Sequence, residues 1–290
     1  MVKRSQGERI FGVFNTIVML LICVATLYPL WYVIIASFSE PLAVSTGAVT
    51  FLPKGFEPAS FKKVLGMDNL WTAYGNTVFY SVAGTSISMV LTVLGAYPLS
   101  KKRLKGRRVL MLFILVTMWF NAGMMPIFLN FKDLHLDNSR LGILLCGTID
   151  TFFVILMRTF FENVPESLEE SAKLDGAKDL RILTSIYLPL SVPALATLTM
   201  YYFVGRWNSY FWSMLLLNDQ DKIPLQVLLK KLIVQVSYNM NEAVDMSATV
   251  MTEQTVVYAT IVIAVIPMLV LYPFIQRFFV KGIMVGAIKG

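Results

Sequence analysis

Charged side chains are scarce in this sequence. Only 15% of its 290 residues are Asp, Glu, Lys or Arg, whereas 56% belong to the hydrophobic set. Soluble globular domains carry about 25% charged and about 45–50% apolar residues, so a soluble fold would have more apolar surface here than it can bury. A lipid bilayer accepts such surface. The composition therefore predicts an integral membrane protein.

Residue types used for catalysis and cross-linking are also rare. The chain has one histidine, His135, and two cysteines, Cys23 and Cys146, both within apolar runs. Their spacing fits neither a disulfide framework nor a metal site, and we expect no metal or cofactor on this chain. No G-x-x-x-x-G-K-[ST] phosphate loop for ATP occurs. Two other classes remain as alternatives to transport, a polytopic membrane enzyme, for which no catalytic motif is found, and a scaffold without transport activity.

Long apolar runs, in contrast, are abundant. A helix needs about 20 apolar residues to cross the hydrocarbon core of a bilayer. Six stretches are long enough: Phe11–Phe38, Thr77–Leu99, Val109–Leu129, Leu141–Phe161, Leu190–Leu216 and Thr255–Phe279. Because a lone strand leaves its backbone groups unpaired in lipid, all six are expected to be helices of one transmembrane domain over residues 1–290. We expect the first span to remain in the mature protein, since no clear signal-peptide cleavage site follows it.

The distribution of basic residues predicts the orientation. The segment Lys101–Arg108, between the second and third spans, is rich in Lys and Arg. With both termini in the cytoplasm, most of the 25 Lys and Arg residues fall in or beside the inner segments, and Arg206 lies within the fifth span. This bias agrees with the positive-inside rule. A nucleic-acid patch is the competing interpretation of Lys101–Arg108, but the charge follows the loops of a membrane protein, and we expect no nucleic-acid partner.

The predicted cytoplasmic segment between spans four and five, residues 163–189, differs from a simple connector. Pro165 suits a first helical turn, and the acids that follow it favour the positive end of a helix dipole. Leu168 and Ala172, with Ser171 as a further candidate, form a narrow face of apolar and small side chains, and Gly176 permits a sharp turn. A helix of this shape can dock in a groove of another protein. The alternative, an amphipathic helix on lipid, is disfavoured by its acidic face, because inner-leaflet lipids are anionic.

Several residues of this segment stand at the spacing E-A-A, three residues, G, nine residues, I-x-L-P. They are Glu170, Ala172, Gly176, Ile186, Leu188 and Pro189. The segment resembles the EAA loop of binding-protein-dependent ABC importers. Ser171 departs from the usual alanine, but serine is small enough for docking to survive. The ATPase-coupling residues that this resemblance implies are Glu169, Glu170, Ser171, Ala172, Asp175, Gly176, Leu188 and Pro189.

The resemblance extends over nearly the whole chain. Trp207-Asn208 with Phe211-Trp212 resembles a signature of the carbohydrate permeases, and Gly286–Gly290 resembles their G-A-V-K-G ending. The smaller membrane subunit of the maltose importer is a familiar relative. Asn121–Pro126 and Arg158–Phe161 look closer to the LplC-type subgroup, which is associated with oligosaccharides, some from acidic polysaccharides. This analogy does not fix a substrate.

The resemblance implies a type I ABC importer permease in the bacterial plasma membrane, surrounded by lipid. Its expected partners are a second and usually different permease subunit, two ATPase subunits that bind ATP and Mg²⁺, an extracytoplasmic solute-binding protein and a sugar or oligosaccharide. The segment Gly282–Gly290 is expected to be slender rather than helical, and its Gly286, Lys289 and Gly290 to contact the ATPase subunits. A frayed terminus is the alternative.

Two charges fall inside predicted spans. Asp150 and Arg206 each lie about ten residues from a span end, which corresponds to a depth of about 15 Å. Such charges face a bundle interior or a wet cavity and often pair. We predict an ion pair between them, with direct binding of substrate as the alternative. The candidate translocation-path residues are Asp150, Arg206, Trp207, Asn208, Tyr210 and Phe211. The neighbouring aromatic residues either stack on sugar faces, pack in the core or belong to an interface belt, and they are Tyr201, Tyr202, Trp207, Tyr210 and Trp212.

Overall fold

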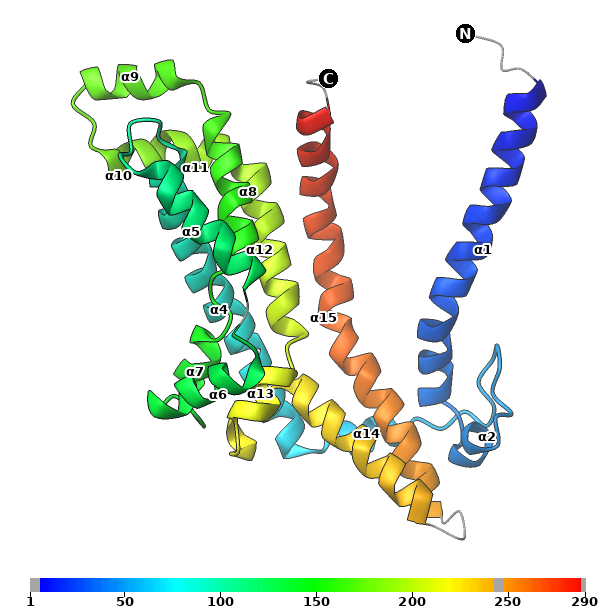
Figure 1. Cartoon of the computed structure of the whole chain (residues 1–290). Helices are drawn as coiled ribbons and strands as arrows, with labels where there is room; N and C mark the ends of the chain where they lie inside the picture. Colours follow the sequence, from blue (N-terminus) through cyan, green and yellow to red (C-terminus); the bar gives the residue numbers. More distant parts are fainter. Residues whose placement is uncertain (1–5, 121, 243–247, 288–290) are drawn as a thin grey trace. The chain divides into compact units, whose positions relative to one another are not determined.

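The regular structure of the chain is helical wherever it is described. The computed structural model describes residues 6–120, 122–242 and 248–287, and in these ranges it contains helices and no strand (Figure 1). The chain divides into two compact units, Met1–Asp68 with Leu229–Ile266, and Asn69–Leu228 with Pro267–Gly290. The predicted all-α class is confirmed.

The first unit begins with the long helix α1 (Gln6–Ser37), followed by the short helices α2 (Pro41–Ser45) and α3 (Ala59–Leu65). Its small core consists of Ile35, Ala36, Val44 and Val49, with Tyr258 of α15 (Ala248–Ala287) packed against it. Most apolar side chains of α1 are exposed, as expected for a helix that faces lipid.

The second unit contains the helices that carry the candidate sites. They are α4 (Asp68–Ser100), α5 (Arg107–Trp119), α6 (Met124–Asp133), α7 (Arg140–Leu145), α8 (Thr151–Glu162), α9 (Glu166–Leu174), α10 (Asp179–Ile182), α11 (Leu188–Leu190), α12 (Val192–Trp207) and α13 (Phe211–Leu216). A π-helical turn, η1 (Leu183–Tyr187), joins α10 to α11, and a 3-10 turn, η2 (Gln220–Lys222), follows α13. The core of the second unit is formed by α4, α8, α10, η1 and α12, with Ala96, Met157 and Leu198 fully buried.

The last two helices, α14 (Leu225–Glu242) and α15 (Ala248–Ala287), each run through both units. Contrary to expectation, α15 continues through Gly286, so this part of the predicted slender tail is helical. The many apolar residues before it favour continuation of the helix and outweigh isolated glycines. Lys289 and Gly290 lie outside the described residues.

Three of the predicted spans are single helices long and apolar enough to cross a bilayer: Ile10–Ser37, Asp68–Ser100 and Glu253–Pro273. The third predicted span is divided between α5 and α6, which are bent by 110°. The fifth begins after a bend of 85° between Asp179–Leu190 and Val192–Trp207. Six crossings therefore remain a prediction, since the described helices supply three to five by length and composition.

The fourth predicted span is not one helix. Helix α7 ends at Leu145, and α8 starts at Thr151. Between them Gly147 has φ +62°, a left-handed conformation that glycine adopts without steric cost. Asp150 is the N-cap of α8, where its side chain accepts a hydrogen bond from the Phe152 N–H at 2.8 Å. The prediction that Asp150 lies within a continuous helix was wrong, because glycine and an N-cap aspartate end one helix and begin the next.

Candidate functional site

Helix α9 is the predicted coupling helix, and its end explains the spacing of the motif. Asp175 is the C-cap, and Gly176 follows with φ +79°. The Gly176 N–H donates to the Lys173 carbonyl at 3.0 Å, and the Ala177 N–H donates to the Ala172 carbonyl at 2.9 Å. These two bonds define a Schellman motif, which requires a left-handed residue at the position of Gly176. The glycine therefore shapes the turn that returns the chain to the core.

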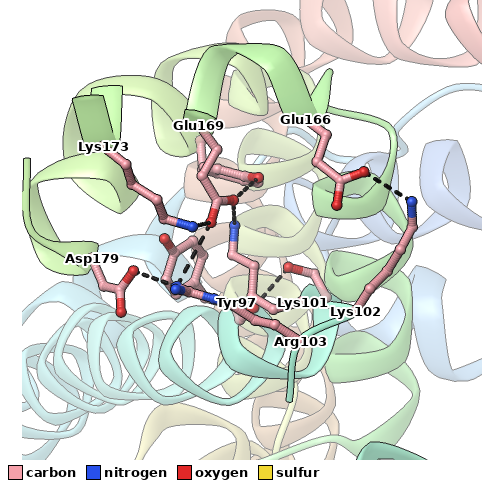
Figure 2. A network of polar contacts seen from close by, with 10 residues as sticks. Tyr97, Lys101, Lys102, Arg103, Glu166, Glu169, Lys173 and Asp179 are labelled. Carbon is pink, nitrogen blue, oxygen red and sulfur yellow. Dashed lines mark hydrogen bonds and ion pairs between the residues drawn. The ribbon is translucent and has the colours of Figure 1, made fainter. Parts of the chain in front are cut away.

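Three consecutive cations clamp this segment to the end of α4 (Figure 2). Lys101 pairs with Glu169 at 2.5 Å, and Lys102 pairs with Glu166 at 3.0 Å. Arg103 pairs with Asp179, beyond the turn, at 2.5 Å. The basic run from which the orientation is predicted thus also holds α9 against its own subunit. Sequence analysis missed this role, because the partners lie more than 60 residues apart.

Glu169 lies at the centre of this set of ion pairs made by Lys101, Lys102 and Arg103, which we call the clamp. Its side chain is 6% exposed, and besides Lys101 it accepts hydrogen bonds from the Lys173 ammonium at 2.5 Å and from the Tyr187 hydroxyl at 2.8 Å. The Lys101 side chain is 8% exposed, and its ammonium also lies over the rings of Tyr97 and Tyr187, at 4.1 Å and 3.5 Å from their centroids. Both charges of the pair are therefore compensated by several groups, as burial of an ion pair requires.

The electrostatics of the clamp favour the ionised pair. Burial by itself raises the pKa of the Glu169 carboxyl, but the hydrogen bonds from Lys101, Lys173 and Tyr187 outweigh it and lower this pKa to about 2. Burial lowers the pKa of Lys101, and its hydrogen bond to Glu169 opposes that shift. Glu169 consequently stays ionised throughout the physiological pH range.

The outward face of α9 differs from the one expected. Ala172 packs against the subunit's own core, so the predicted docking face of Leu168 and Ala172 is wrong in its second member. Glu170 and Ser171 are exposed, and Leu174 is 90% exposed. Sequence analysis missed Leu174, whose position one turn after Glu170 is the signal that places both on one face.

The other predicted coupling residues lie at the return to the membrane helices. Asp175 is exposed at the C-cap of α9. Leu188 packs on the core, and Pro189 lies in α11, after the π-helical turn. Because proline has no N–H and its ring crowds the carbonyl four residues earlier, a widened turn before Pro189 suits it better than a regular α-helix.

A second candidate site is a cavity of about 350 Å³ within the second unit. Its wall combines tyrosines and a tryptophan with small residues and the two predicted intramembrane charges. The residues that line it are Thr77, Tyr80, Ile143, Cys146, Gly147, Asp150, Phe153, Tyr201, Tyr202, Gly205, Arg206, Ser209, Trp212, Ser213 and Pro224.

Asp150 and Arg206 both line this cavity, but they do not form the predicted ion pair. Asp150 caps α8, whereas the two terminal nitrogens of Arg206 donate to the carbonyls of Ile143 at 2.8 Å and Leu144 at 3.1 Å. Each charge is instead placed where a helix end favours it, the carboxylate at an N-terminus and the guanidinium at a C-terminus.

Arg206 completes the hydrogen bonding of the α7 end. The last four carbonyls of a helix have no partner within it. In α7 the carbonyl of Gly142 accepts from Cys146 N–H and that of Leu145 from Thr148 N–H, which leaves Ile143 and Leu144. Arg206 serves both, and the Thr148 hydroxyl adds a bond to Leu144 at 2.6 Å. The guanidinium therefore stabilises the break in the fourth span.

The other predicted path residues do not line this cavity. Trp207 is 2% exposed and packs between Tyr74 and Phe203. Asn208, Tyr210 and Phe211 are exposed elsewhere on the unit. Their role in the path remains a prediction. Three of the aromatic residues considered for sugar stacking, Tyr201, Tyr202 and Trp212, line the cavity, whereas Tyr80 is a cavity residue that the sequence did not indicate.

Replacing Gly84 by alanine is expected to disturb Arg206. A Cβ at this position of α4 would lie 3.0 Å from Arg206 Nε and 3.2 Å from its Cδ and Cζ, so the side chain must shift. Overpacking of this kind costs about 1–3 kcal/mol, and we expect a lower unfolding temperature and weaker uptake. Gly75→Ala on the same helix is the control, because its Cβ would meet no atom within 4 Å. Equal stability of the two variants would contradict the close approach.

Comparison with known proteins identifies the family of the chain. Residues 88–285 match the family described as binding-protein-dependent transport system inner membrane component. The polygalacturonan/rhamnogalacturonan transport system permease protein YtcP of Bacillus subtilis is 41% identical over 93% of this chain and 94% of its own. Protein LplC of the same organism is 34% identical over 99% of this chain and 97% of its own.

A solved structure is similar over almost the full length. It is a chain of a bacterial ABC transporter involved in the import of the acidic polysaccharide alginate, with a TM-score of 0.88, 43% identity, and coverage of 96% of this chain and 100% of that one. These relatives are transport proteins, and the chain is a permease rather than a catalytic enzyme. The chain belongs to the family of inner membrane components of binding-protein-dependent transport systems and is a multi-pass membrane protein with the type I ABC permease fold.

Proposed function

We propose that the chain is the permease subunit of an ATP-driven importer for oligosaccharides of acidic, uronic-acid-containing polysaccharides. The observation that carries the substrate class is full-length similarity to two proteins whose names specify polygalacturonan and alginate transport. The permease works with ATPase subunits, a solute-binding protein and a second permease. ATP and Mg²⁺ would bind the ATPase subunits.

Helix α9 is the proposed dock for an ATPase subunit. Two observations support this role. On one side of α9, Glu169 is bound by residues of the subunit itself. On the other side, Glu170, Ser171 and Leu174 are exposed. With α9 in the cytoplasm, both termini are cytoplasmic as well. Gly286, Lys289 and Gly290 remain proposed contacts with the ATPase subunits.

Uptake by the reconstituted importer tests the substrate class. Proteoliposomes that contain this chain with its partner permease, ATPases and binding protein should import oligogalacturonate in an ATP-dependent manner. Neutral oligosaccharides of the same length should be imported poorly. Import of the neutral sugars alone would refute the acidic substrate, and assembly without uptake of either sugar would favour a scaffold.

Gly176→Leu is expected to weaken the dock. A left-handed conformation costs an ordinary L-residue about 1–2 kcal/mol, so the Schellman turn is strained even though the space around Gly176 is open. ATPase subunits should co-purify in lower yield, and uptake should fall. Gly176→Asn is the control, because asparagine tolerates this conformation and should retain more binding. Normal uptake by the leucine variant would remove the turn from the coupling mechanism.

A further inference from the structure

A second surface at the end of α4 combines cations with apolar side chains. A groove of about 840 Å³ lies beside the first turns of α5 and contacts α8. Its polar part contains Lys102, Arg107, Arg108 and Arg158. The proposed coupling site and this groove share Lys102 and Arg107, so the two are adjacent.

The cations of the groove are incompletely neutralised. Arg107 and Arg158 both pair with one carboxylate, that of Glu162, and their side chains are about one-fifth exposed. Lys102 pairs with Glu166 on the side of the coupling helix. Arg108 is exposed, and the first turn of α5 contains no acid. Four cations thus face two carboxylates, which leaves a surplus of positive charge at the groove.

The rest of the groove is apolar and accessible. Met111, Leu112 and Leu115 line it along α5, none of whose residues is buried, and Leu112 is 62% exposed. From Arg108 to Leu115 the helix rises about 10 Å, which is the distance from a headgroup into the first part of an acyl chain. A cationic end followed by an apolar wall matches a ligand that has an anionic headgroup and a hydrocarbon chain.

We propose that this groove binds an anionic phospholipid, with its phosphate near Arg107, Arg108 and Arg158 and an acyl chain along α5. Basic pockets beside transmembrane helices on the cytoplasmic side select anionic headgroups. The orientation rests on the proposed function, because α9 must be cytoplasmic, but the site does not depend on which sugar is carried. A soluble anion would leave the apolar wall uncovered.

Lipid binding by the assembled importer tests this site. The purified complex is titrated with phosphatidylglycerol or phosphatidylcholine in detergent, and bound lipid is measured by native mass spectrometry. Wild-type complex should prefer phosphatidylglycerol. Loss of two cations in Arg107→Gln/Arg108→Gln should weaken its binding by about thirtyfold, because each cation near an anionic lipid surface contributes about 1 kcal/mol. Arg107→Lys/Arg108→Lys should retain most of the preference.

The matched control is Lys62→Gln/Lys63→Gln, which removes two exposed cations from α3 outside the groove. It should bind phosphatidylglycerol as the wild type does. Equal binding of both lipids by the wild type, or undiminished phosphatidylglycerol binding by the double glutamine variant, would overturn the proposal. If that variant loses ATPase subunits but keeps its lipid, the groove is a protein-docking surface. Because lipid is counted without transport, failure of the sugar assay leaves this test intact.

Discussion

Glu169→Gln is expected to uncouple the importer. The substitution leaves the Lys101 ammonium buried beside a neutral amide, and removal of one partner from a buried ion pair costs about 3–5 kcal/mol. A change of this size lowers the equilibrium constant for correctly held α9 by more than about a hundredfold. We therefore expect a large loss of uptake, measured in proteoliposomes with ATP hydrolysis followed in parallel.

Two further variants separate this effect from a direct contact with the ATPase. Lys101→Met/Glu169→Gln removes both charges and should recover part of the uptake, since no charge remains buried without its partner. Glu170→Gln, one residue along the helix and exposed, should leave the unfolding temperature unchanged but reduce ATPase co-purification. If Glu169→Gln and Glu170→Gln behave alike, or if the double variant is no better than the single one, the clamp does not have this role.

The clamp should also withstand moderate acid. The folded-state pKa of Glu169, about 2, lies below its ordinary value. The corresponding stabilisation is therefore fully present above the ordinary carboxyl pKa and is lost only as the pH falls toward 2. Between neutral pH and about pH 5, any loss of coupling must come from other groups, because the Glu169 carboxyl does not titrate there.

Arg206→Gln is the second substitution with a large expected effect. It removes the one hydrogen bond that Arg206 donates to the Ile143 carbonyl, and an unsatisfied buried carbonyl costs about 1–3 kcal/mol. Leu144 retains the Thr148 hydroxyl. We expect reduced stability of the complex and weaker uptake, because the break that lines the cavity loses its support.

Asp150 provides the contrast. Asn is nearly as good an N-cap as Asp, so Asp150→Asn should change stability by only about 0.5 kcal/mol or less. Since the two charges share no hydrogen bond in the structure, the double variant should show additive losses within about 0.5 kcal/mol. Thermal unfolding and uptake of the two single variants and the double variant measure this. Partial recovery in the double variant would instead support the ion pair that was predicted from the sequence.

The helical class could be predicted from hydropathy, but the breaks could not be predicted by hydropathy alone. Cys146, Gly147, Thr148 and Ile149 are small or apolar, so the fourth apolar run continues across them. The turn glycine and the capping aspartate were nevertheless visible as local signals. They were outweighed by the expectation that one apolar run forms one helix.

The candidate sites also have a part that could be predicted from the sequence and a part that could not. The motif from Glu170 to Pro189 could be located because it is contiguous in sequence. The partners of Glu169 could not, since Lys101 is one of several cations in its loop. The partners of Arg206 are backbone carbonyls, which every residue possesses, so no side-chain pattern indicates them. Asp150, a carboxylate at similar predicted depth, was therefore predicted as the partner of Arg206.

Helix α4 connects the clamp with the membrane cavity. Thr77 and Tyr80, in the first half of this helix, line the cavity, and Lys101 directly follows the last residue of the helix. The intervening 20 or so residues span about 30 Å, so a tilt of about 10° around the cavity end would displace the clamp by about 5 Å. Two ion pairs, Lys101–Glu169 and Lys102–Glu166, tie α9 to that end, and a third, Arg103–Asp179, ties the start of α10 to it. We therefore expect a movement of α9 to be transmitted along α4 to the cavity wall. If α9 is the ATPase dock, as we propose, a small displacement of α9 would then change the width of the cavity without an intermediate hinge.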